Sequence, residues 1–263
     1  YFHLELDSYK YLHAYCLDLN IEFMCSAFDM QSLDFINEFV SIHKIPSGEI
    51  NHYPYLQQIA QYNKKTILST GMATLVEIQN ALNVLEENGL KKDNIVIMHC
   101  TTQYPTDQSE VNLLVLNTLS DAFPEAQIGY SDHTIGYDVS IAASALGATF
   151  FEKHFTLDKN LPGPDHKASL SAEELKIYVT KLRAIQEAFG SSIKAPTKNE
   201  LLNKKIVRRT IVASTQINKG QVFTKDNLIC KRPEIGLDPM NWPNLIGKIS
   251  KRNYKKDDPI SMS

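Results

Sequence analysis

The sequence predicts an α/β protein with a parallel sheet, followed by a small, mostly β domain. Short apolar runs of strand length alternate with amphipathic helical stretches as far as about residue 190. Most of these runs are unbroken rather than alternating, as expected for strands that are buried on both faces. After Gly190 the pattern changes to short β-like runs that are separated by turn signals. These three observations fix the predicted fold class.

Six apolar runs are the expected strands of the sheet. They are Ile21–Ser26, Ile42–Ser47, Thr66–Thr70, Ile95–Cys100, Gln127–Ser131 and Thr149–Phe155. Because strand–helix units repeat along the chain, we expect the strands to be parallel. Six units fit either a doubly wound sheet or an incomplete (β/α)8 barrel.

Capping signals mark the start of two helices between and after these strands. Thr74 and Glu77 have the spacing of a capping box and precede an apolar series at helical spacing, which Gly89 ends. Ser171 and Glu174 repeat the same device before the next long amphipathic stretch. Both segments are therefore predicted to be helical.

The change of pattern divides the chain. Residues 1–190 are expected to form the strand–helix domain, and residues 191–203, which are polar, to form a linker. Residues 204–263 are expected to form the small β domain, with strands at Thr210–Ala213 and Gln221–Phe223. Turn signals such as Asn218-Lys219-Gly220 lie between the strands of this part.

Composition excludes several classes of protein. The net charge of -3 gives no reason to expect a nucleic-acid partner, and no apolar run is long enough to span a membrane. The four cysteines are scattered without CxxC spacing, so reduced thiols in a cytoplasm are expected rather than a disulfide framework. No signal peptide stands at the start. The chain begins with Tyr1 in what looks like the interior of a helix, so we expect its natural start to lie upstream.

Polar clusters end nearly every apolar run. In α/β barrels the carboxyl ends of the strands face the active site, so these clusters should converge on one cavity. The alternative is that strand ends are polar simply because loops begin there. The clusters are Ser26; Lys44, Ser47 and Glu49; Ser69 and Thr70; His99, Thr101, Thr102 and Tyr104; Ser131, Asp132 and His133; and Lys153 and His154.

Two of these residues are candidate metal ligands. His133 and His154 end consecutive expected strands, so both imidazoles would reach one ion if the strands are neighbours. Two neutral histidines with water or substrate oxygens suit a divalent metal such as Mn, Zn or Co. The alternative is that each histidine is structural.

Other strand-end residues have the chemistry of an anion site. Lys44, Ser47, Ser69 and Ser131 together offer a positive charge and several hydroxyl donors, which a phosphate requires. Each serine alone is equally explained as a turn or cap. Asp165, in the loop after the last expected strand, has a carboxylate that would hold substrate hydroxyls or tie down its own loop.

Several short strings along the chain are more specific than the single residues above. The strings are Lys44-Ile-Pro-Ser-Gly-Glu49, Leu68-Ser-Thr-Gly-Met72, His99-Cys-Thr-Thr-Gln-Tyr-Pro-Thr106, Gly129-Tyr-Ser-Asp-His-Thr134, Glu152-Lys-His-Phe-Thr156, Pro162-Gly-Pro-Asp-His-Lys-Ala-Ser169, Val207-Arg-Arg-Thr-Ile-Val-Ala213 and Lys231-Arg-Pro233. In their order and spacing they resemble the sialic acid (nonulosonate) synthase family with its C-terminal antifreeze-like (SAF) domain. The resemblance spans essentially the whole chain.

The resemblance implies a TIM-type (β/α)8 barrel followed by the antifreeze-like domain. It implies an enzyme that condenses phosphoenolpyruvate with N-acetylmannosamine to give N-acetylneuraminate and phosphate, with a divalent metal, Mn before Mg or Co. It also implies a homodimer with a swapped C-terminal domain. A legionaminate synthase acting on a 2,4-diacetamido-trideoxy sugar is the alternative within the family.

The resemblance also implies a role for each matching residue. His133 and His154 would hold the metal, Glu49 would be the acid/base, and Tyr104 and Asp165 would contact the sugar. Arg232 would reach a neighbouring subunit to hold the acyl group of the sugar. The residues implied to hold phosphoenolpyruvate are Ser26, where the family usually has threonine, and Lys44, Ser47, Ser69, Thr102 and Ser131.

The sequence departs from the family at two places. Thr102 stands where several members have asparagine, and the first two strand–helix units of the family barrel have no counterpart in the chain. An inactive fragment is therefore one alternative, and a sugar-binding or assembly protein that keeps the fold is another. A Schiff-base aldolase that uses Lys44 or Lys153 without a metal is the rival enzyme.

Overall fold

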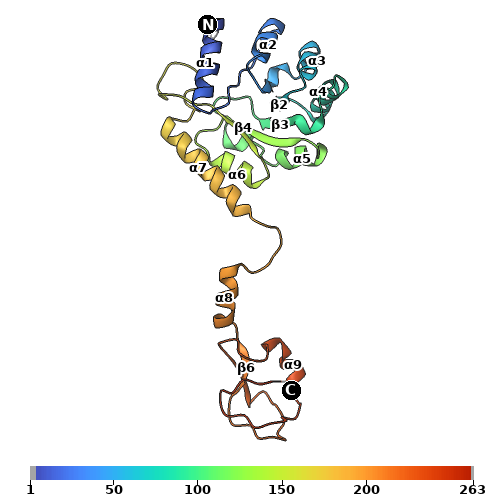
Figure 1. Cartoon of the computed structure of the whole chain (residues 1–263), viewed down its shortest axis with the longest axis vertical. Coiled ribbons are helices and arrows are strands. Elements are labelled where there is room, and N and C mark those ends of the chain that lie inside the picture. Colours follow the sequence, from blue (N-terminus) through green and yellow to red (C-terminus); the bar gives the residue numbers. More distant parts are fainter. Residues whose placement is uncertain (1–3, 262–263) are drawn as a thin grey trace. The chain divides into compact units, whose positions relative to one another are not determined.

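The computed structural model describes residues 4–261, which divide into two compact units at the Gly190–Ser191 junction. The first unit is a parallel sheet of five strands in the order β1-β2-β3-β4-β5 (Figure 1). The strands are β1 (Ile42–Ile45), β2 (Lys65–Ser69), β3 (Ile95–Cys100), β4 (Gln127–Asp132) and β5 (Phe150–Lys153). The α/β class with parallel strands is therefore confirmed.

Helices follow or precede each strand of this unit and lie around the sheet in Figure 1. They are α1 (Leu6–Asp18), α2 (Met30–Asn37), α3 (Tyr53–Gln61), α4 (Leu75–Glu87), α5 (Val115–Ala122), α6 (Asp138–Ala145) and α7 (Ala172–Phe189). Three short 3-10 turns complete the unit: η1 (Ser47–Glu49), η2 (Lys92–Asn94) and η3 (Gln108–Glu110). In the part of the chain that the structure describes, no helix combines the length and the apolar character needed to cross a bilayer.

The sheet is curled into part of a barrel. In a flat sheet, four strand spacings of about 4.8 Å would hold β1 and β5 roughly 19 Å apart. Yet the ammonium of Lys44 on β1 lies 3.3 Å from the carboxylate of Glu152 on β5. Two side chains meet across that distance only if the strands bend round a common interior. The five strands therefore form an open half-barrel, and the barrel interpretation holds over the doubly wound one.

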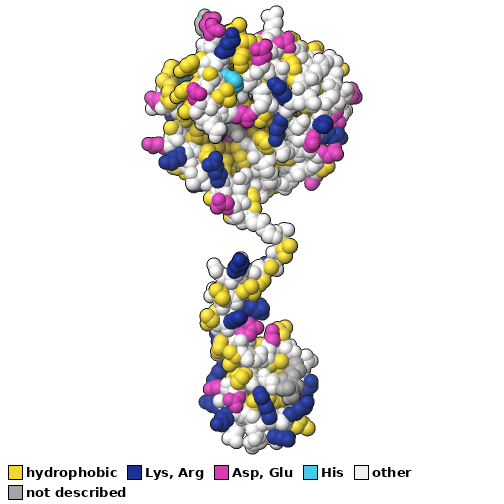
Figure 2. Space-filling model, in the orientation of Figure 1, with side chains coloured by type: hydrophobic (Ala, Val, Ile, Leu, Met, Phe, Trp, Pro, Cys, Tyr) yellow, Lys and Arg dark blue, Asp and Glu magenta, His cyan; other side chains and the backbone are white. Residues whose placement is uncertain are grey.

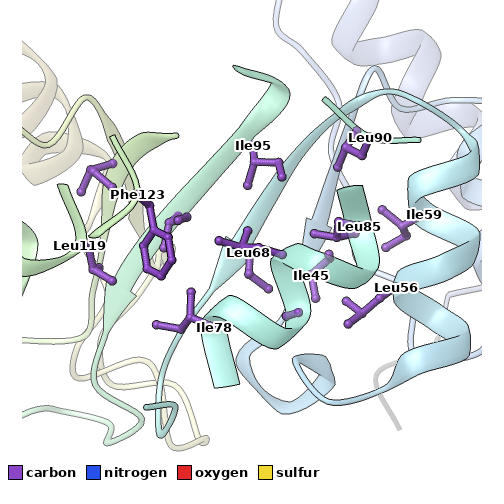
Figure 3. Close-up of a cluster of buried hydrophobic side chains, with 14 of the residues drawn as sticks. Ile45, Leu56, Ile59, Leu68, Ile78, Leu85, Leu90, Ile95, Leu119 and Phe123 are labelled. Atoms are coloured by element: carbon purple, nitrogen blue, oxygen red, sulfur yellow. The ribbon is translucent and has the colours of Figure 1, made fainter. Parts of the chain in front are cut away.

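The two faces of the sheet bury different sets of side chains. Successive residues of a strand point to opposite faces. Ile45, Leu68 and Ile95 point outward and pack with Leu56, Ile59, Ile78 and Leu85 of α3 and α4 (Figure 3). Ile67, Val96 and Met98 point inward and form a small separate cluster. This alternation later decides which strand-end side chains share the interior.

One predicted strand is absent from the described sheet. Residues 21–27 have no regular secondary structure and make no ladder, and β1 is an edge strand of the described sheet. Ile21 is 60% exposed, and the carbonyl of Ala27 accepts from the Tyr55 hydroxyl at 2.8 Å. A strand needs a neighbour for its backbone groups, and this segment is held by a side chain instead. The expectation of a strand at Ile21–Ser26 is therefore wrong, and the other five are confirmed within two residues at either end.

Both predicted capping boxes are present. The Thr74 hydroxyl accepts from the backbone N–H of Glu77 at 3.3 Å, and the Glu77 carboxylate accepts from the backbone N–H of Thr74 at 2.8 Å. Ser171 and Glu174 make the equivalent pair of bonds at 3.3 Å and 2.9 Å. Gly89, just beyond α4, has φ +107°, a conformation that favours glycine.

The second unit has its own core. β6 (Thr210–Ala213) pairs antiparallel with β7 (Leu228–Lys231), and η4 (Pro239–Asn241) and α9 (Trp242–Leu245) pack nearby. Its buried residues are Ile211, Ala213, Ile217, Phe223, Leu228, Leu245, Tyr254 and Ile260. The expected strand at Gln221–Phe223 is reduced to one isolated bridge between Val222 and Ile249.

A helix crosses the boundary that the sequence predicts between linker and small domain. α8 (Lys198–Val207) begins inside the polar stretch 191–203 and ends inside the expected β domain. Thr197 and Glu200 form a third capping box at its start. None of the α8 side chains is buried, so the segment has the polar composition of a linker. The capping box at its start nevertheless favours a helix.

Charged side chains are mixed on the surface of the first unit. Figure 2 shows Lys and Arg side chains interspersed with Asp and Glu over the visible face of that unit.

Candidate functional site

Polar side chains gather at the carboxyl ends of the strands, on the inner face of the half-barrel. Register places Ser131 of β4 opposite Cys100 of β3 and opposite Glu152 of β5. Lys44 reaches the same Glu152 from β1. Ser69 ends β2 and has the same parity as the inward Ile67. All five strands therefore contribute to one interior surface.

The two histidines expected to hold a metal are neighbours. The ring centroids of His133 and His154 lie 5.3 Å apart, with the ring planes at 68°. The Tyr104 ring packs against both, at 4.2 Å from His133 and 5.4 Å from His154. Asp165 lies beside this group, with its carboxylate 3.8 Å from Nδ1 of His154. The structure thus brings together four of the residues that the sequence singles out.

The orientation of His133 is fixed by the backbone. Its Nδ1 lies 2.8 Å from the carbonyl of Thr101, and because a carbonyl only accepts, Nδ1 carries the proton. Nε2 is then the nitrogen with a free lone pair, and it lies 3.3 Å from the Ser131 hydroxyl. Burial lowers the pKa of His133 below its ordinary value, so the neutral imidazole is favoured. A neutral imidazole with one nitrogen held by a carbonyl is the form that ligates metals.

Anion-binding groups lie next to the histidine pair. The Ser131 hydroxyl donates to Glu152 at 2.8 Å, and the other oxygen of that carboxylate faces the Lys44 ammonium. The Ser69 hydroxyl is buried and, among the described residues, has no hydrogen-bond partner. An unsatisfied buried hydroxyl costs free energy, and a ligand oxygen at this point would satisfy it. The chemistry of the group fits a phosphoryl or carboxylate ligand.

Ser47 supports the same surface from the turn after β1. Its hydroxyl accepts from the backbone N–H of Gly71 at 3.0 Å and lies 3.3 Å from the Cys100 thiol. A Cβ at Gly71 would stand 2.4 Å from the Thr102 hydroxyl, so only glycine lets the loops after β2 and β3 approach this closely. Thr102 also lines a cavity of about 670 Å³ between these loops and helices α4 and α5.

A buried ionic network lies directly behind the site, on the outer face of β4 and β5. The Asp132 carboxylate accepts from the backbone and hydroxyl of Thr134, both at 2.8 Å, and from Ser140 at 2.6 Å. The ammonium of Lys153 lies 3.3 Å from the same carboxylate and donates to the Thr134 carbonyl. Burial lowers the pKa of Lys153, and the Asp132 charge opposes that shift. The network fixes the turn that carries His133.

Two expected site residues make no described contact with this group, and a third belongs to the second unit. Glu49 makes its contact with His52, whose Nδ1 lies 2.8 Å from the carboxylate. Ser26 lines a different cavity, of about 380 Å³, together with residues of α1 and α2. Arg232 belongs to the second unit, where it is exposed directly after β7. The structure therefore links neither Glu49 nor Ser26 to the histidine pair by a direct contact.

Glu152 is a site residue that the sequence analysis did not single out. It begins the string Glu152-Lys-His-Phe-Thr156 and lies on β5, two residues before His154, which follows the end of that strand. Residues two apart in the expected strand Thr149–Phe155 would share a face, so an interior His154 implied an interior Glu152. The same rule placed Lys153 on the opposite face, away from the site.

The donor set is suited to a metal with few protein ligands. No group of three or more His, Cys, Asp or Glu side chains within residues 4–261 has the arrangement of a metal site. Two imidazoles alone leave most positions of a Mn, Co or Zn ion to oxygen atoms from substrate and water. The residues present fit an open catalytic site rather than a closed structural one.

Comparison with known proteins identifies the family of the chain. Residues 1–194 match the NeuB family, and residues 208–263 match the SAF domain. The chain belongs to the NeuB family. The predicted resemblance to sialic acid synthases with an antifreeze-like domain is thereby confirmed.

Individual relatives cover nearly the whole chain. It is 51% identical to the N,N'-diacetyllegionaminic acid synthase of Campylobacter jejuni over 258 residues, which are 98% of this chain and 77% of that protein. It is 34% identical to the human N-acetylneuraminate-9-phosphate synthase, over 98% of this chain and 72% of that protein. The solved structure of an N-acetylneuraminic acid synthetase from Leptospira borgpetersenii, in complex with citrate, has a TM-score of 0.71 at 30% identity, covering 76% of this chain and 70% of that one. The chain is a homologue of nonulosonic acid synthases.

Proposed function

We propose that the protein condenses phosphoenolpyruvate with an N-acylated mannosamine-type sugar to give a nonulosonic acid and phosphate. The observation that carries the proposal is that anion-binding side chains and a histidine pair lie on the same surface. An anion cradle of Lys44, Ser69 and Ser131 lies beside the His133–His154 pair. Such a surface suits a phosphorylated substrate next to a metal-activated carbonyl.

The cradle has the donors that phosphoenolpyruvate requires. Lys44 supplies a fixed positive charge, and the hydroxyls of Ser69, Ser131 and Ser47 supply hydrogen bonds to phosphoryl or carboxylate oxygens. Holding the substrate at several points fixes which face of its methylene carbon meets the sugar. Orientation of this kind lowers the barrier of a bimolecular step.

We propose that His133 and His154 hold a divalent metal, Mn before Mg or Co. When bound, such an ion supplies Lewis-acid polarisation of the aldehyde carbonyl of the open-chain sugar. The Thr101 carbonyl keeps Nε2 of His133 available as a ligand. Tyr104 packs on both imidazoles. In this proposal Asp165, whose carboxylate lies 3.8 Å from His154, accepts hydrogen bonds from the sugar hydroxyls.

The proposed reaction proceeds in two bond-forming steps. The methylene carbon of phosphoenolpyruvate attacks the aldehyde carbon and forms the new carbon–carbon bond, which leaves positive charge on the enol carbon. Water then adds to that carbon, and the tetrahedral intermediate loses phosphate. Glu49 is the candidate for moving a proton in these steps, with His52 as the group that shares its hydrogen bond.

The surroundings of Lys153 weigh against the rival Schiff-base aldolase. A nucleophilic lysine must present a free amine to the carbonyl. The side chain of Lys153 is 2% exposed, and its ammonium is engaged by Asp132 and the Thr134 carbonyl. Lys44 is paired with Glu152, and borohydride trapping tests whether it forms a Schiff base.

Within the proposal, we place the 2,4-diacetamido-trideoxy sugar, which gives a legionaminate, before N-acetylmannosamine. The 51% identity to the Campylobacter enzyme supports this order, against 34% to the human N-acetylneuraminate-9-phosphate synthase. We also propose that the protein acts in the cytoplasm as a homodimer in which Arg232 of one chain reaches the acyl group bound by the other. Size measurement in solution tests the dimer.

Phosphate release tests the function. The protein is incubated with Mn, phosphoenolpyruvate and either sugar, and phosphate is followed over time. Release that depends on both sugar and metal supports the proposal, and the faster sugar identifies the product. A lysine adduct that borohydride traps with pyruvate, formed without metal and without phosphate release from phosphoenolpyruvate, would overturn it in favour of the aldolase. If folded protein releases no phosphate with either sugar, the protein has the fold of the family but does not catalyse this reaction.

A further inference from the structure

Glu152 occupies an unusual position for a carboxylate, because it lies inside a surface built to bind anions. One of its oxygens accepts from the Ser131 hydroxyl at 2.8 Å, and the other lies 3.3 Å from the Lys44 ammonium. These are two of the donors that the proposed function assigns to phosphoenolpyruvate. The carboxylate therefore makes the contacts that a phosphoryl group would make.

The two side chains of this ion pair differ in their exposure to solvent. The Lys44 side chain is 12% exposed, whereas that of Glu152 is 44% exposed. Glu152 lies on β5, an edge strand of the described sheet. The lysine is thus held among its neighbours, and the carboxylate has room to turn toward water.

Ser131 makes the competition strict. A serine hydroxyl has one hydrogen to donate, and in the structure it goes to Glu152. A phosphoryl oxygen that takes this hydrogen must displace the carboxylate. Repulsion acts in the same direction, because a phosphoryl group beside Glu152 would set two anions against one ammonium.

Resting on the proposed function, we propose that Glu152 is an internal anion that competes with phosphate and phosphoenolpyruvate for Lys44 and Ser131. It is a positioning residue: it holds both donors in the geometry of the cradle, and it yields them to an incoming phosphoryl group. After the reaction it takes them back, which weakens the hold on the phosphate product. Binding of anions is thereby kept weak enough for release.

The test is direct binding without turnover. The full chain and Glu152→Gln are titrated with inorganic phosphate and with phosphoenolpyruvate in a calorimeter, with no sugar present. Glutamine keeps the size of the side chain and removes its charge. Because the competing ion pair is partly exposed, we expect Glu152→Gln to bind both anions about three- to tenfold more tightly.

A control separates this effect from a general change of charge. Glu173→Gln, at the exposed start of α7, changes the net charge equally and is expected to leave both affinities unchanged. Should Glu152→Gln fold poorly, Glu152→Asp serves instead. It keeps the charge, is too short to span Lys44 and Ser131 together, and is expected to bind the anions more tightly than the parent by a smaller factor.

The outcomes distinguish the inference from the function on which it rests. Unchanged or weaker anion binding by folded Glu152→Gln overturns the competition, while binding by the parent keeps the proposed function. Tighter binding by Glu173→Gln as well would overturn the assignment to Glu152. If neither the parent nor Glu152→Gln binds either anion, both the cradle and the competition are wrong.

Discussion

The two faces of the sheet at the ends of β4 and β5 use the same residue types for opposite purposes. On the outer face, Asp132 and Lys153 form an ion pair whose side chains are 0% and 2% exposed, and every carboxylate oxygen is hydrogen-bonded. On the inner face, one residue away in sequence, Ser131 and Glu152 belong to a group that is partly open to solvent. The two groups differ in how fully their polar atoms are hydrogen-bonded within the protein.

The outer network is fully hydrogen-bonded, whereas the inner group leaves one buried hydroxyl without a partner among the described residues. Both carboxylate oxygens of Asp132 accept hydrogen bonds from protein donors, so no ligand is needed to satisfy them. Ser69, on the inner side, is buried without a partner among the described residues. Polar groups of this kind are unfavourable unless a ligand satisfies them. The following predictions test the contrast, from the largest expected effect to the smallest.

Breaking the outer network should cost the most stability. Asp132→Ala leaves the Lys153 ammonium buried without its counter-charge, and we expect the free energy of unfolding to fall by about 3–5 kcal/mol. Urea unfolding of the first unit measures it. Glu125→Ala, which removes one partner of Lys92 in an exposed pair, is the control and should cost less than about 1 kcal/mol. Equal losses would show that the outer network is not structural.

Removing an inner-face histidine should cost activity instead. His154→Ala is expected to lower kcat/KM in the metal-supported reaction by roughly 100-fold or more, as loss of a metal ligand or its support does. The His154 side chain is 33% exposed, so the unfolding midpoint should hardly change. His13→Ala, on α1 beside Phe23 and Phe39, is the control and should keep its activity. Full activity of His154→Ala would contradict the metal assignment.

A buried histidine on the outer face should appear in the pH dependence of stability. Burial lowers the pKa of His43 from its ordinary 6.5 to about 4, with the Lys64 charge acting in the same direction. The folded state therefore keeps His43 neutral while the unfolded state takes up a proton. Stability is fully present above pH 6.5 and is lost as the pH falls toward 4, by about 2 kcal/mol at pH 5.

Unfolding measured between pH 7 and pH 5 tests this expectation. His43→Phe keeps a ring against Tyr62 and removes the titrating group, so its stability should fall less over the same range. Parallel pH profiles for the parent and the variant would show that His43 does not contribute. His43 would then not belong to the outer-face groups that affect stability.

The two unsatisfied serines give the smallest and sharpest contrast. Ser69→Ala and Ser144→Ala each remove a buried hydroxyl that lacks a partner, so neither should lower stability. Ser69→Ala should weaken phosphoenolpyruvate binding about tenfold, the value of one hydrogen bond to a charged ligand. Ser144 lies in α6 and should leave that binding unchanged. Equal binding by both variants would remove Ser69 from the cradle.

Local signals predicted the regular elements well. Five of the six strands expected in the sheet, one of the two expected in the small domain and both capping boxes are present, because strand propensity and caps depend on neighbouring residues. The strand at Ile21–Ser26 was wrong since a strand also needs a pairing partner, which no local pattern shows. α8 was missed because its polar composition resembles a linker, although Thr197 and Glu200 carried the capping signal.

The sequence alone determined the fold class, the family resemblance and the residue types of the site. The expectation that every strand-end residue faces one cavity was wrong for Asp132 and Lys153, because side chains alternate along β4 and β5 and these two pair on the outer face. What only the tertiary structure decided is which side chains meet. The curl of the sheet brings Lys44 of β1 to Glu152 of β5, over a sequence separation that no periodicity encodes. Contacts of that kind depend on the curvature of the whole sheet, so the Lys44–Glu152 ion pair became visible only in the folded chain.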